Sequence, residues 1–162
     1  MTASAKTATR PAATGTAYTD DVYTWTLEQG ARLQAGDFDA LDLENLAQEI
    51  ESSGKSQFSS LVSAWRVVLL HRPKFDHQPS RRTMCCAFTI VTQRIATAYE
   101  LEDSQGLKSR QDEAMERAYD RARLEAARET RLPLKTFPET CSYTREEMPT
   151  RPLAIDPDDT TA

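Results

Sequence analysis

Apolar residues recur at intervals of three and four through most of the chain, which is the spacing of a buried face on an α-helix. The first such stretch covers residues 20–35 and carries Trp25 on its apolar stripe. Thr19 or Asp20 can cap its first turn, and Gly36 stands where a left-handed residue often ends a helix. The pattern therefore predicts a first helix over residues 20–35.

The longest apolar pattern follows over residues 42–72, and Asp42 is a good N-cap for it. Gly54 lies inside this stretch, where glycine costs about 1 kcal/mol relative to alanine. The apolar positions nevertheless continue beyond it. Pro73 lacks a backbone N–H and is expected to end the run. The sequence predicts either one long helix or two helices with a bend at Gly54.

A third helix is predicted over residues 80–101, because its apolar positions alternate by four and three residues. These positions are Met84, Phe88, Val91, Ile95 and Ala98. Taken with the earlier stripes, the spacing predicts a set of core residues. We expect this core to contain Trp25, Leu46, Ile50, Leu61, Trp65, Val68, Phe88, Val91 and Ile95.

A fourth long helix is predicted over residues 108–131, where small alanines would let a neighbouring helix approach closely. An extended segment should follow and pack through Phe137 and Tyr143. Thr144 and Glu147 have the spacing of a capping box, which predicts one final helical turn.

These elements predict an all-α fold, an irregular bundle of four to five helices with disordered termini. We expect one helical domain over residues 18–148. The flanking segments, residues 1–17 and 149–162, have too few large apolar residues to offset chain entropy and are expected to be disordered tails.

Composition indicates the cellular compartment of the protein. No stretch approaches the 18 or so apolar residues of a membrane-spanning helix, and no apolar segment follows the basic residues near the N-terminus. Cys85, Cys86 and Cys141 are an odd number without a framework spacing, which indicates reduced thiols. We therefore expect a cytoplasmic protein.

One long stretch resembles a known family. Residues 18–52 carry Trp25, then Glu28 and Gln29, then the run from Asp42 to Glu51. This is similar to the opening of the bacterial, cyanobacterial-type family known as domain of unknown function 29. Further similarities are Pro79 with Arg81-Arg82, Thr89-Ile90, Gln93-Arg94-Ile95, Glu129-Thr130, Leu132-Pro133, Phe137-Pro138 and Cys141 to Thr144.

The resemblance covers about residues 18–148. It implies an all-helical fold and implies no activity. The chain departs from the family at Cys85-Cys86, because the family usually has Ser-Trp there, near the start of the helix predicted over residues 80–101.

Residue spacings give no strong sign of catalysis or of a bound cofactor. Glu44 and Glu51 share a helix face, as a metal site or an acid–base pair would require, but a solvated face is the simpler interpretation. His71 and His77 match no zinc signature, and adjacent cysteines on a helix point about 100° apart. We expect no catalytic residue, no metal and no cofactor, and consider an enzyme improbable.

Charge is distributed unevenly along the chain. Residues 20–54 have a net charge of −8, residues 55–98 a net charge of +6, and the whole chain −5. Pairing between the two segments is the simpler interpretation, and we expect Arg81 or Arg82 to pair with an acid from residues 37–51. The alternative is a patch that binds a partner or phosphate. Its candidate residues are Arg66, Arg72, Lys74, His77, Arg81 and Arg82.

Three functions remain open. The favoured one is a non-catalytic protein-interaction module, antitoxin- or adaptor-like, that binds an unknown protein partner or itself. Nucleic-acid or phosphate binding through residues 66–82 is the alternative, although the acidic whole disfavours a general nucleic-acid binder. An enzyme of unknown type comes third.

Overall fold

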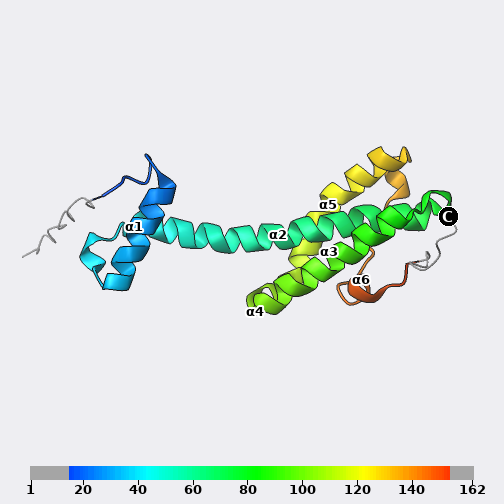
Figure 1. The fold of residues 1–162 in the computed structure, drawn as a ribbon. Coiled ribbons are helices and arrows are strands. Elements are labelled where there is room, and N and C mark those ends of the chain that lie inside the picture. Colours follow the sequence, from blue (N-terminus) through cyan, green and yellow to red (C-terminus); the bar gives the residue numbers. More distant parts are fainter. Residues whose placement is uncertain (1–14, 154–162) are drawn as a thin grey trace, which may run out of the picture. The chain divides into compact units, whose positions relative to one another are not determined.

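The computed structural model describes residues 15–153, and within them every regular element is helical (Figure 1). The all-α prediction is confirmed. The predicted tails lie largely outside this described part. The α-helices are α1 (Val22–Ala35), α2 (Leu43–His77), α3 (Met84–Asp103), α4 (Gln105–Lys108), α5 (Gln111–Thr130) and α6 (Glu147–Thr150). Short 3-10 turns lie at Phe38–Ala40, Pro79–Arg81 and Leu134–Thr136.

Contacts divide the described residues into two compact units, residues 15–54 and 55–153, and each is described by itself. No helix of the described part is both long and apolar enough to cross a membrane. Helix α2 is helical throughout, Gly54 included, so the alternative of two separate helices is wrong.

The first unit is organised around Trp25, which is buried and stacks edge-on against Tyr18. Its indole Nε1 donates to Asp42 Oδ2 at 3.3 Å, and Gln29 Oε1 accepts from the Asp42 backbone N–H at 2.9 Å. Asp42 also accepts from the Asn45 N–H, which confirms it as the cap of α2. The residues that resemble the family's opening therefore hold α1 against the start of α2.

Two glycines of this unit should respond to substitution with opposite signs. Gly36 ends α1 with φ +74°, where a Cβ is strained, so Gly36→Ala should cost about 1 kcal/mol. Gly54 is helical and a Cβ there meets no atom within 4 Å, so Gly54→Ala should add about 0.5–1 kcal/mol. Urea unfolding of the two variants measures both changes, and a loss of stability in Gly54→Ala would contradict the continuous helix.

The core of the second unit is formed by α2, α3, α5 and the segment after α5, and Figure 1 shows these three helices side by side. The alanines of α5 that the sequence placed inside are buried in this core. The main contributors are Leu61, Trp65, Val68, Ile90, Ala114, Ala118, Ala122, Phe137, Tyr143 and Met148. The capping box is also confirmed, because Glu147 N donates to Thr144 Oγ1 and Thr144 N donates to Glu147 Oε2.

Pro73 does not end α2, so that prediction is wrong. The helix continues to His77, and Gln78 N donates to Lys74 O at 2.9 Å beyond the proline. A proline inside a helix costs about 3 kcal/mol, chiefly through a lost hydrogen bond. Here Pro73 and Phe75 are both buried, and their packing offsets that cost.

Helix α3 presents the opposite face to the one predicted. Its buried positions are Ala87, Ile90 and Thr97, while Phe88 is 57% and Ile95 50% exposed. Val91 is exposed as well. Helix α3 also begins at Met84, capped by Thr83, rather than at residue 80.

Two predicted core positions of the first unit also differ from expectation. Ile50 is 72% exposed and Leu46 is only half-buried. The other predicted core residues, namely Trp25, Leu61, Trp65 and Val68, are buried.

Candidate functional site

Two members of the predicted basic patch are engaged by acids of α5. Arg66 pairs with Glu125, and Lys74 Nζ lies 2.6 Å from Glu129 Oε2. The hydrogen bond from Lys74 lowers the pKa of the Glu129 carboxyl. These two side chains therefore fix α2 against α5 and are not displayed as a continuous basic surface.

Arg72 lies near arginines from distant parts of the chain. Arg72 is buried, with 4% of its surface exposed, and its charge acts on those of Arg82, Arg94 and Arg151. Burial lowers the pKa of Arg72 and of Arg94, and the neighbouring positive charges add to this effect. Asp76 is the acid that Arg72 and Arg151 contact in the described residues.

Three of these arginines donate to neutral backbone oxygens. Arg72 Nη1 donates to Pro152 O at 2.9 Å, Arg94 Nη2 to Arg151 O at 2.9 Å, and Arg82 Nε to Phe75 O at 2.8 Å. A carbonyl orients a guanidinium without cancelling its charge. The cluster of Arg72, Arg82, Arg94 and Arg151, here called the arginine cluster, therefore keeps a surplus of positive charge.

Asp76 contacts two arginines of this cluster. Its Oδ1 is 3.9 Å from Arg72 Nε, and its Oδ2 is 3.6 Å from Arg151 Nη2. The Tyr143 hydroxyl donates to Oδ2 at 2.8 Å. Burial, and then this hydrogen bond, raises the pKa of Tyr143, so the phenol stays protonated as a donor.

A cavity of about 420 Å³ opens beside Asp76. Its polar lining comes from Arg82, Arg151, His77, Asp76 and Ser142. Pro73, Pro138, Tyr119 and Tyr143 supply the apolar and aromatic walls. The edge of His77 also meets the Phe137 ring at 5.3 Å between centroids. The structure thus brings Arg72, His77 and Arg82 of the predicted patch to one place.

A second cavity, of about 580 Å³, also borders Tyr119 and Tyr143. Five acids line it, with Arg145 as its basic residue. These acids are Asp112, Glu116, Asp120, Glu139 and Glu146. The two cavities therefore have opposite charge and share aromatic residues.

The expected pairing of the arginines that precede α3 remains a prediction. The side chain of Arg81 lies outside the description, so the expected pairing of Arg81 or Arg82 with an acid of residues 37–51 stays a prediction.

Burial, and then the charge of Lys74, lowers the pKa of His71. No group of three or more potential metal ligands occurs in residues 15–153.

The outward face of α3 is the most apolar exposed surface of the second unit. Phe88, Val91, Ile95 and Tyr99 lie on it at helical spacing. Residues 83–99 contain a single charged residue, Arg94, and that side chain is turned toward the Arg151 carbonyl. We call the exposed side of residues 84–99 the α3 face.

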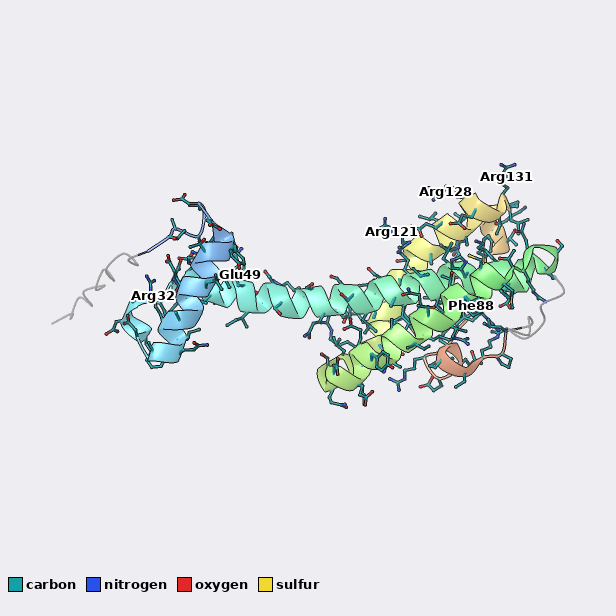
Figure 2. All side chains as sticks on the ribbon, viewed as in Figure 1. Arg32, Glu49, Phe88, Arg121, Arg128 and Arg131 are labelled. Carbon is teal, nitrogen blue, oxygen red and sulfur yellow. The ribbon has the colours of Figure 1, made fainter. Side chains whose placement is uncertain are left out.

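The exposed side of α5 is charged, as Figure 2 shows for Arg121 and Arg128, and Arg131 follows directly after the helix. Acids one helical turn away pair with its arginines, for example Glu125 with Arg121 at 3.1 Å. Leu124 is exposed there among charged neighbours. The second unit therefore has one strongly charged helix face and one uncharged, apolar face.

The arginine cluster includes two residues that the predicted patch missed. Arg151 lies in the predicted C-terminal tail, so no local pattern connected it with α2. Arg94 offered a signal, because it is the single charged residue of residues 83–99, and a charge that is buried among apolar neighbours needs a polar partner. Cys85 is exposed, whereas Cys86 and Cys141 are half-buried, and all three are free thiols.

Comparison with known proteins gives one match. The model of the family described as Domain of unknown function DUF29 matches residues 17–151. This match covers most of the 162 residues, so the chain belongs to that family. Neither the curated proteins nor the solved structures include a significant match.

Proposed function

We propose that this member of the family is a non-catalytic, adaptor-like interaction module of the bacterial cytoplasm that binds a partner helix through the α3 face. The observation that carries the proposal is the orientation of α3. It buries Ala87, Ile90 and Thr97, and it leaves the apolar side chains of Phe88, Val91 and Ile95 exposed. Fully covering one such side chain contributes about 1.5–3 kcal/mol.

The α3 face is suited to an uncharged amphipathic helix. Met84, Phe88, Val91, Ile95 and Ala98 alternate by four and three residues, which is the seam spacing of paired helices. Thr89, Thr92 and Ala96 beside the seam are small enough for close approach. A charged partner would lose hydration here without gaining a counter-charge.

A second copy of the chain offers a helix of this chemistry, and we propose it as the occupant. A two-fold axis near Val91 and Thr92 would place Phe88 of one copy beside Ile95 of the other. The chain carries a net charge of −5 and would repel itself over most surfaces. The uncharged α3 face avoids that repulsion.

The nucleic-acid alternative has less support. Arg66 and Lys74 are occupied by Glu125 and Glu129, and Arg72 is buried. A polyanion would also meet the acids beside Tyr119 and Tyr143. The free thiols agree with a reducing compartment, which supports the cytoplasmic location.

Sedimentation velocity over a dilution series tests the proposal. We expect the wild-type chain to dimerise with a dissociation constant of about 1–100 µM, because the face is small and association costs entropy. Phe88→Glu places a charge in the seam and should leave a monomer. Phe88 is already exposed, so the melting temperature of this variant should change little.

Leu124→Glu is the matched control, because it adds the same charge at an exposed leucine of α5. It should dimerise as the wild type does. A wild-type chain that remains monomeric at about 1 mM would contradict the self-association. Equal weakening by both variants would contradict the assignment to the α3 face.

A further inference from the structure

We propose that the cavity beside Asp76 binds the phosphate group of a small phosphorylated molecule. This site is separate from the α3 face and goes beyond the proposed function. It rests on the geometry of the arginine cluster, on the cavity that borders it, and on the distribution of acids around that cavity.

The first observation is the uncompensated charge. Arg72, Arg82 and Arg94 each donate to a backbone carbonyl, and Asp76 is shared between Arg72 and Arg151. Arg72 Nε is buried without a hydrogen-bond partner, since its 3.9 Å separation from Asp76 is an ion pair only. Like charges gathered around a buried guanidinium repel one another, and a bound anion would relieve that repulsion.

The second observation is that donors reach the cavity itself. Arg82 and Arg151 line it, together with His77 and Ser142. Arg82 uses Nε for the Phe75 carbonyl, which fixes its guanidinium on the cavity wall. A guanidinium offers paired N–H groups that match two phosphate oxygens. Two guanidinium groups therefore favour a ligand with a doubly charged phosphate over a ligand with one carboxylate.

The third observation concerns size and surroundings. A volume of about 420 Å³ exceeds that of a phosphate ion, so an organic group can occupy the rest beside Tyr119, Tyr143 and Pro138. The neighbouring cavity is lined by acids, among them Asp120 and Glu139. A ligand with one phosphate avoids these acids, whereas a nucleic-acid strand would extend its charges over them.

Thermal unfolding and calorimetry with inorganic phosphate and with phenyl phosphate test the site, using sodium chloride at matched ionic strength as the reference. Phosphate at about ten times its dissociation constant should raise the melting temperature by about 3–6 °C. Phenyl phosphate should bind more tightly than inorganic phosphate, because its ring can contact the aromatic walls. Acetate should give a smaller shift than phosphate.

Substitutions locate the binding. Arg151→Gln should weaken phosphate binding about tenfold, since it removes a charge-assisted donor from a half-exposed position. Arg82→Gln should act in the same direction. Asp76→Asn should tighten binding, because it removes the acid that faces the anion. Arg117→Gln, on the exposed side of α5, is the control and should leave binding unchanged.

Some results would overturn the assignment. One is a phosphate shift no larger than that of sodium chloride. Another is a shift that persists in Arg151→Gln and Arg82→Gln, or that Arg117→Gln reduces equally. Binding of a DNA or RNA oligonucleotide more tightly than phenyl phosphate would replace the small ligand by nucleic acid. The dimerisation test does not depend on any of these outcomes.

Discussion

Replacing Trp65 by alanine is expected to lower the free energy of unfolding of the second unit by about 3–5 kcal/mol, as large aromatic truncations in cores do. Trp65 is 1% exposed and packs in the cluster that joins α2, α3 and α5. Urea unfolding followed by far-ultraviolet circular dichroism measures the change. A loss below about 1 kcal/mol would place this side chain outside the core.

Trp65→Phe is the matched control. The indole Nε1 is buried and has no hydrogen-bond partner among the described residues. Phenylalanine removes this unpaired donor while it keeps most of the apolar volume. We therefore expect Trp65→Phe to cost less than half of what Trp65→Ala costs.

Replacing Asp76 by alanine is expected to cost about 2–3 kcal/mol. Arg72 and Arg151 would lose the carboxylate that they share, and the Tyr143 hydroxyl would lose its acceptor. Removing one partner from a fully buried pair costs more, but Asp76 is partly exposed and water screens the loss. Urea unfolding at neutral pH measures this change.

Asp112→Ala provides the comparison for this prediction. Asp112 pairs with Arg145 at 3.4 Å in a largely exposed position, and such pairs contribute about 0.2–1 kcal/mol. If Asp76→Ala cost no more than Asp112→Ala, Asp76 would not be the acid on which the arginine cluster depends.

Local sequence patterns predicted the helix ends that depend on one residue or on a hydrogen bond between near neighbours. Gly36 ends α1 in the left-handed region, because glycine is unstrained there. Asp42 and the pair of Thr144 and Glu147 cap helices through hydrogen bonds between near neighbours. The prediction that Pro73 ends α2 was wrong, because tertiary packing outweighed the free-energy cost of a proline inside a helix.

Helix α3 shows where periodicity fails. It carries two stripes of heptad-like spacing, and the more apolar stripe was expected inside. The structure buries the other stripe, where Arg94 and Thr97 have backbone carbonyl partners at 2.9 Å. Hydrogen bonds of this kind offset the free-energy cost of burying polar groups. Helix periodicity alone therefore does not determine which face is buried.

The candidate site was only partly predictable for a related reason. Charge counting identified residues 66–82 but could not tell which side chains pair internally. Arg66 and Lys74 found acids more than fifty positions away on α5. Arg151 joined the arginine cluster from a segment predicted to be disordered. Such distant contacts depend on the fold and leave no local pattern.

The most direct test of the central proposal is site-specific disulfide cross-linking at the α3 face. With the three native cysteines replaced by alanine, Thr92→Cys places one exposed thiol beside the expected two-fold axis. Mild oxidation should convert this variant to a covalent dimer, while Leu124→Cys in the same background should stay monomeric. Cross-linking of Leu124→Cys but not of Thr92→Cys would contradict pairing through the α3 face.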